Sequence, residues 1–170
     1  MKQEKKLYKE GPEEFPVSKV VQGNALMVIW ILLGGIGCWL FHPLAAWIYL
    51  AVAVVMVFFV LRRLVCTNCD YYGKRCALGW GKLSALMFKR GNIDLFAGSI
   101  GVKLAPVTYG LLSLVPLVFI IVSLVQGFAT VKVVILVLLL LISIYSGGIS
   151  RRKGCAECRM KLICPGAAVK

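Results

Sequence analysis

Four long apolar runs, separated by charged or turn-forming segments, dominate the pattern of the chain. None of the four contains Asp, Glu, Lys or Arg. Each approaches the roughly 20 apolar residues that a helix needs to cross a bilayer. Because backbone polar groups have no partner in lipid, such spans are expected to be helices rather than open strands. The predicted spans are residues 24–41, 44–61, 104–125 and 133–149.

Composition supports an all-α membrane protein over a soluble helical domain. Hydrophobic residues make up 60% of the 170 residues, and the mean hydropathy is +0.87. Four apolar helices buried in a soluble core would leave too little polar surface to cover them. The first run follows a polar stretch of 23 residues and leads to no small-residue cleavage site, so we interpret it as a retained span rather than a signal peptide.

The distribution of Lys and Arg predicts the orientation. These residues gather in the N-terminal arm, in the loop 62–103 and in the tail after residue 150, whereas the two short connections carry almost none. By the positive-inside rule, we expect both termini and the middle loop to face the cytoplasm. Topology and anionic lipid head groups then account for most of the net charge of +13, so the expected partner is the lipid bilayer and not nucleic acid.

One cysteine signature occurs twice, each time after a span and a pair of arginines. An offset of 89 residues relates the arginines and the first two cysteines, and 88 residues relate the third. The first copy consists of Arg62, Arg63, Cys66, Cys69 and Cys76. The second copy consists of Arg151, Arg152, Cys155, Cys158 and Cys164. We therefore predict four transmembrane helices built from two parallel two-helix hairpin repeats, each followed by a cysteine loop and related by a pseudo-twofold along the membrane normal.

This organisation divides the chain into four parts. Residues 1–23 form a polar arm expected to lie along the membrane face, and residues 24–79 form the first hairpin with its cysteine loop. Residues 80–103 form a cytoplasmic connector, and an amphipathic helical pattern from residue 78 to residue 96 covers most of it. Residues 104–170 form the second hairpin and loop. Small residues in the first and fourth spans are expected to allow close helix contact: Gly34, Gly35, Gly37, Gly147 and Gly148.

The cysteines point to metal binding more strongly than to other thiol chemistry. Disulfides need an oxidising compartment, and the predicted side is reducing. A redox dithiol would use each Cys-x-x-Cys pair but leaves the third cysteine of each copy unexplained. Thiolates are soft metal ligands, and a two-residue gap lets two of them reach one ion. We predict Cys66, Cys69, Cys76, Cys155, Cys158 and Cys164 as ligands, with the four arginines anchoring the loops at the lipid phosphates and stabilising thiolate charge.

Zinc and iron–sulfur remain alternatives for the metal. Two Cys-x-x-Cys pairs complete a four-cysteine zinc site, but this leaves Cys76 and Cys164 without a role. Iron–sulfur clusters use Cys-x-x-Cys with a more distant cysteine, and a final cysteine followed by proline is a common ending of such motifs, as in Cys164-Pro165. Two clusters with three cysteines each, or one shared cluster, would use all six thiols.

The same residues resemble those of the membrane-bound ferredoxin-type proteins of nitrate and nitrous-oxide respiration, which carry cysteine motifs at the cytoplasmic ends of spans two and four. The matching residues are Arg152, Cys155, Cys164, Pro165, Gly166 and Ala167 in the second copy, and Arg63, Cys66, Cys76, Leu78 and Gly79 in the first. That family separates its paired cysteines by three residues, whereas five lie between Cys158 and Cys164. The resemblance implies electron transfer or the maturation of a redox enzyme.

Other functions find less support in the chain. The spans contain no charged residue for a transport pathway, and neither a Ser-His-Asp set nor paired carboxylates are available for hydrolysis. Cys38, the seventh cysteine, is expected to pack as a small apolar residue. We expect a cytoplasmic-face iron–sulfur centre with a redox or membrane protein partner, and assembly into an oligomer is compatible with this. The alternatives are a zinc-stabilised module that binds a partner, a thiol redox protein and a heavy-metal carrier.

Overall fold

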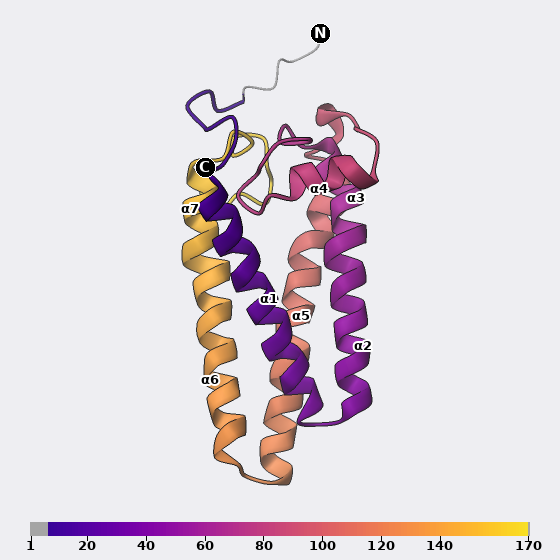
Figure 1. Cartoon of the computed structure of the whole chain (residues 1–170), viewed down its shortest axis with the longest axis vertical. Helices are drawn as coiled ribbons and strands as arrows, with labels where there is room; N and C mark the ends of the chain where they lie inside the picture. Colours follow the sequence, from indigo (N-terminus) through magenta and orange to yellow (C-terminus); the bar gives the residue numbers. More distant parts are fainter. Residues whose placement is uncertain (1–6, 170) are drawn as a thin grey trace.

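The long helices stand side by side in an elongated bundle (Figure 1). The computed structural model describes residues 7–169. Within this range every regular element is helical, as the hydropathy pattern predicts. Both short connections lie at one end of the bundle, and the loops, the segment 7–16 and the tail 157–169 lie at the other (Figure 1).

Two spans are single helices and two change their winding before they end. The single helices are α1 (Val17–Trp39) and α5 (Ile100–Gln126). The second span comprises α2 (Pro43–Val54), the π-helix η1 (Val55–Val60), α3 (Leu61–Leu64) and the 3₁₀ turn η2 (Cys66–Asn68). The fourth comprises α6 (Thr130–Ile144), the π-helix η4 (Tyr145–Ser150) and α7 (Arg151–Ala156). The two π-helices begin 90 residues apart, and each ends close to an arginine pair. One residue separates η1 from Arg62, and η4 ends directly before Arg151.

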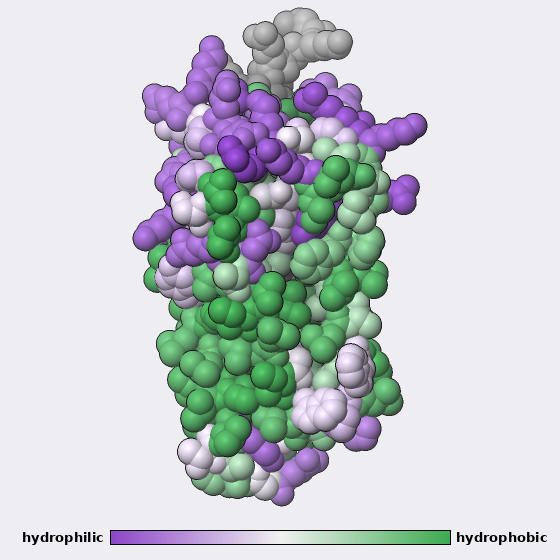
Figure 2. Space-filling view, viewed as in Figure 1, coloured by the Kyte–Doolittle hydropathy of each residue, from purple (hydrophilic) through white to green (hydrophobic). Residues whose placement is uncertain are grey.

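Four helices are long and apolar enough to cross a membrane, which confirms the prediction of an all-helical protein with four candidate spans. Their limits are Val17–Trp39, Pro43–Asn68, Ile100–Gln126 and Thr130–Ala156. Figure 2 shows hydrophobic side chains over most of the bundle surface and hydrophilic ones gathered chiefly over the end with the loops. This distribution suits a bundle surrounded by lipid, with one polar end in water.

The helices extend beyond the limits that hydropathy predicts. Helix α1 begins at Val17, directly after Pro16, whose extended backbone precedes the first turn, so residues 17–23 of the expected arm are helical. The fourth span continues to Ala156, which places Cys155 in a helix rather than a loop. The connector forms only a short helix, α4 (Trp80–Met87), followed by the turn η3 (Ile93–Leu95), because the backbone becomes extended at Phe88.

Glycines of the first span allow the close helix contacts expected of them. A Cβ at Gly34 would collide with the hydroxyl end of Tyr49, and one at Gly37 would lie 2.6 Å from Cδ1 of Ile120. The expectation is wrong for Gly147 and Gly148, because nothing within the described chain lies within 4 Å of a Cβ built at either position. Cys38 is fully buried in the core, as predicted.

Hydrogen bonds hold the two short connections together at the far end of the bundle. The Ser123 hydroxyl of α5 donates to the Leu40 carbonyl after α1, at 2.8 Å. Lys132 Nζ donates to the carbonyls of Ser123 and Gly127 at 2.6 and 2.8 Å, so its charge caps the C-terminus of α5. The bond from Ser123 to Leu40 joins the two hairpins, whereas those of Lys132 lie within the second hairpin.

Candidate functional site

All six cysteines of the repeated signature lie where the second and fourth spans end, and all are free thiols. Cys66 lies in η2 and Cys155 lies in α7, so helix ends fix the first cysteine of each copy. Cys69 follows η2 directly and Cys158 lies two residues after the end of α7, whereas Cys76 and Cys164 lie in the irregular segments beyond. We call residues 66–79 the first cysteine segment and residues 155–167 the second.

The same hydrogen-bonded turns occur in both cysteine segments. The amide of Cys69 donates to the Cys66 carbonyl at 3.3 Å, and the amide of Cys158 donates to the Cys155 carbonyl at 3.2 Å. Three further amide-to-carbonyl bonds of the first segment have counterparts in the second, at offsets of 88 or 89 residues. The bonds of the first segment run from Tyr72 to Cys69, from Lys74 to Tyr71 and from Gly79 to Cys76. Their counterparts run from Lys161 to Cys158, from Ile163 to Met160 and from Ala167 to Cys164. The two segments therefore share local backbone structure as well as cysteine spacing.

The two segments contact each other. Arg159 Nη1 lies 3.5 Å from a carboxylate oxygen of Asp70, and the Arg159 amide donates to the Tyr71 hydroxyl at 3.4 Å. Cysteines of both copies also pack against one buried apolar cluster: Phe15, Tyr71, Phe96, Val102 and Met160. Thiols from both copies thus line one region.

Residues 7–16, which we call the N-terminal strap, cross both cysteine segments. The Tyr8 amide donates to the Arg159 carbonyl at 2.9 Å, and the Phe15 amide donates to the Arg75 carbonyl at 2.8 Å. The backbone of this part of the arm is thus bonded to both cysteine segments, and its expected position along the membrane face stays a prediction. Residues 1–6 lie outside the described residues.

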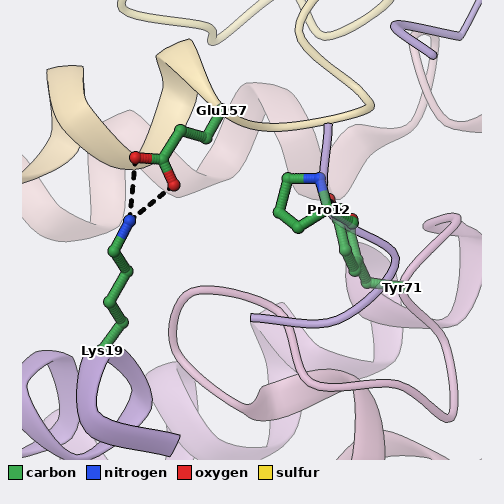
Figure 3. Close-up of polar contacts among 4 residues, drawn as sticks. All are labelled: Pro12, Lys19, Tyr71 and Glu157. Atoms are coloured by element: carbon green, nitrogen blue, oxygen red, sulfur yellow. Dashed lines mark hydrogen bonds and ion pairs between the residues drawn. The ribbon is translucent and has the colours of Figure 1, made fainter. Parts of the chain in front are cut away.

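Side chains strengthen the attachment of the N-terminal strap. Figure 3 shows the Tyr71 hydroxyl, which donates to the Pro12 carbonyl at 2.8 Å, beside the ion pair of Lys19 with Glu157. A second ion pair, from Arg75 to Glu14 at 2.7 Å, joins the first cysteine segment to the strap. The ring of Phe15 is 1% exposed, and its centroid lies 5.6 Å from that of Tyr71. The strap therefore covers the region that the thiols line.

Burial favours the protonated form of three thiols in this region, because it raises their pKa. It raises the pKa of Cys158 to about 11, with a smaller contribution from neighbouring thiols, and it also raises the pKa of Cys69 and of Cys164. The Trp80 amide donates a hydrogen bond to the Cys76 sulfur at 3.2 Å. A metal that binds these sulfurs has to displace their protons.

The described residues do not form a ready-made metal site. Among residues 7–169, no three Cys, His, Asp or Glu side chains converge closely enough to hold an ion. A Zn–S bond is about 2.3 Å long. The sulfur ligands of one ion must therefore lie much closer together than cysteines that only pack against a common cluster. The chain brings the donor set to one end of the bundle, and coordination would require the cysteine segments to close further.

The four arginines of the signature occupy different environments. Arg63 and Arg152 are exposed, and Arg151 Nη2 donates to the Gly166 carbonyl at 2.6 Å, so it ties the second segment to its helix. Arg62 is 1% exposed, and its guanidinium lies against the rings of Phe58 and Trp80, which also contact each other. Arg62 therefore does not extend to the lipid phosphates as expected, because its guanidinium is enclosed by aromatic side chains.

Sequence reasoning missed the contribution of the strap and of the aromatic pair around Arg62. Phe58 lies four residues before Arg62 on the same span, a spacing at which helical side chains meet. No comparable signal identifies Trp80 or Phe15, since only the folded loop and strap bring them to this site.

Comparisons with protein-family models, with curated proteins and with solved structures find no match to the chain. Its function has to be inferred from its own residues.

Proposed function

We propose that the six cysteines hold one metal centre, an iron–sulfur cluster, in an integral membrane protein that serves in electron transfer or in the assembly of a redox enzyme. The observation that carries this proposal is the contact between two cysteine segments of matching structure. Cysteines of both copies pack against the same buried apolar cluster, and the same turns follow the cysteines in each. Iron–sulfur is preferred to zinc because each copy supplies Cys-x-x-Cys with a more distant cysteine, and the second copy ends in Cys164-Pro165.

An internal repeat is part of the proposal. It is supported by the matching order of elements in the second and fourth spans, where an α-helix passes into a π-helix and then into a short α-helix, with starts 90 residues apart. Two hairpins related by a pseudo-twofold along the membrane normal would bring equivalent segments to one surface. Such an arrangement favours a shared site at the axis, because both copies approach it in the same way.

The cytoplasmic location of the centre is also proposed, and it rests on Lys and Arg. The end of the bundle with the cysteine segments carries nearly all of these residues, and the far end carries little besides Lys132. By the positive-inside rule the cysteine end would face the cytoplasm. A reducing compartment would keep the thiols available as ligands, and a soluble or membrane-bound redox protein could exchange electrons there.

Metal and sulfide analysis of protein purified without oxygen tests the proposal. We expect bound iron with acid-labile sulfide, and a visible absorption band that bleaches with dithionite. Colourless protein with one zinc per chain would replace the proposal by a zinc-stabilised module. Metal-free protein whose thiols are reversibly oxidised would replace it by dithiol chemistry.

A further inference from the structure

An open pocket lies beside the end of the second span. Its volume is about 400 Å³, and its lining residues are Arg63, Thr67, Met87, Phe88 and Lys89. Arg63 belongs to α3 and Thr67 to η2, whereas the other three form the end of α4 and the residues directly after it. The pocket therefore lies between the end of a membrane span and the connector that leads to the next span.

Hydrogen bonds fix the two walls of this pocket relative to each other. The Gly91 amide donates to the Thr67 carbonyl at 3.0 Å, and the Tyr72 hydroxyl donates to the Phe88 carbonyl at 2.7 Å. The Thr67 hydroxyl donates to the Arg63 carbonyl at 2.7 Å, which holds this side chain against its own helix end. The pocket is therefore preformed, so a ligand does not have to order the connector in order to bind.

The pocket carries positive charge. Arg63 and Lys89 are both exposed, and none of the lining residues is acidic. The three ion pairs formed among residues 7–169 use other cations, namely Lys19, Arg75 and Arg159. A guanidinium matches the geometry of phosphate oxygens and an ammonium binds phosphate as a point charge, so the pair suits a phosphate group.

The position of the pocket corresponds to the level of lipid head groups. Phe59, four residues before Arg63 on the same span, is exposed, and helical residues at this spacing share a face. Arg63 therefore lies where an apolar, lipid-facing surface gives way to the polar end of the bundle (Figure 2). Met87 and Phe88 add apolar surface beside the two cations. Such a combination suits a molecule with an anionic head and apolar chains.

We propose that this pocket binds an anionic phospholipid. Arg63 and Lys89 hold its phosphate, and Met87 and Phe88 contact the glycerol and the first part of the acyl chains. An anionic head group is favoured over a zwitterionic one, because the latter brings an ammonium group towards two fixed cations. The site needs no metal centre, so it stands or falls independently of the proposed function.

Two double variants separate the pocket from the general charge of this end of the bundle. Arg63→Gln/Lys89→Gln removes both charges of the pocket. Arg152→Gln/Lys153→Gln is the matched control, because both residues are exposed at the equivalent end of the fourth span. Within residues 7–169 no helix follows the second cysteine segment, so Arg152 has no counterpart of the α4 wall.

Each full-length protein is stripped of lipid in neutral detergent and titrated separately with phosphatidylglycerol, phosphatidylcholine and inorganic phosphate. Native mass spectrometry counts the bound lipid, and the melting temperature reports binding of all three probes. We expect wild type and the control to bind a first phosphatidylglycerol at a concentration at least about tenfold lower than the pocket variant needs, since each contact with a cation adds to the affinity. Wild type should also prefer phosphatidylglycerol to phosphatidylcholine.

Three results would overturn the inference. Equal phosphatidylglycerol binding by the two double variants would show that charge acts through the whole surface. Equal affinity of wild type for the two lipids would show that the head group is not selected, and equal stabilisation by inorganic phosphate would make the pocket a site for a free anion. Should the pocket variant not fold, Lys89→Gln is compared with Lys82→Gln, an exposed lysine of α4 outside the pocket, and equal lipid binding by these two would likewise overturn the inference.

Discussion

Gly81 is a residue at which a single methyl group decides whether the first cysteine segment can close. A Cβ built there would overlap the carbonyl oxygens of Tyr71 and Lys74. The Gly81 carbonyl in turn accepts a hydrogen bond from the Gly73 amide at 3.0 Å. Backbone atoms cannot move aside as a flexible side chain can, so the loop that carries Cys76 requires glycine at this position.

We predict that Gly81→Ala lowers the free energy of unfolding by about 1–3 kcal/mol, the usual cost of overpacking. Gly98→Ala is the matched control, because nothing lies within 4 Å of a Cβ at Gly98. Thermal unfolding of the two variants in detergent measures the difference. Equal melting temperatures would show that the loop around Gly81 accommodates a methyl group, which would contradict the close packing described here.

Sequence reasoning at the residue scale identifies chemistry better than environment. The spacing of the cysteines and arginines is visible in the chain, and the structure brings all six thiols to one end. The burial of Arg62 is not visible, because Trp80 lies 18 residues further along and reaches the guanidinium only once the loop has folded. Local spacing indicates which side chains can act, whereas tertiary contacts determine which of them share an environment.

Among the elements, the N-terminal strap connects otherwise separate parts of the site. It bonds to the first cysteine segment through Phe15 and Arg75, and to the second through Tyr8 and Arg159. Its buried anchor is Phe15, whereas its ion pair, from Glu14 to Arg75, is about one-third exposed on both side chains. Apolar burial therefore contributes more to this attachment than the partly exposed pair, which is worth at most about 1 kcal/mol.

Phe15→Ala should release the strap and expose the thiols beneath it. Truncating a buried Phe costs about 3–5 kcal/mol. We predict faster maleimide labelling of Cys69, Cys158 and Cys164 in metal-free Phe15→Ala than in wild type, followed by mass spectrometry. Lys19→Gln is the control and should label at nearly the wild-type rate. Identical labelling of wild type and Phe15→Ala would contradict a covering role for the strap.

The helices illustrate why spans are easier to predict than their ends. Hydropathy identifies the lipid-facing stretches because it measures the same transfer energy that selects them. It cannot identify the polar turns at which α1 begins, where Pro16 sets the start and Lys19 pairs with Glu157 from the far end of the chain. The continuation of α7 through Cys155 escapes prediction for the same reason, since its residues are polar and lie outside the apolar run.

For the molecule as a whole, the unequal distribution of Lys and Arg between the two ends of the bundle predicts its orientation in the membrane. Two exposed side chains of equal accessibility report on the ends: Phe128 in the connection between α5 and α6 is 81% exposed, and Leu86 of α4 is 82% exposed. We predict that an impermeant maleimide labels Phe128→Cys in intact cells and labels Leu86→Cys only after the membrane is opened. The reverse pattern would place the cysteine segments outside and weaken the case against disulfides.

The most direct test of one shared centre is the metal content of a protein that lacks half of the signature. In a shared centre, ligands from both segments would act on one ion or cluster at high effective concentration, so losing one Cys-x-x-Cys pair should weaken binding far more than by half. Anaerobically purified Cys66→Ser/Cys69→Ser protein should lose most of its metal although Cys155, Cys158 and Cys164 are intact. Cys38→Ser, a change in the buried core away from the signature, should keep the wild-type content. A double variant that retained half of its metal would contradict the shared centre, because each segment would then bind metal independently.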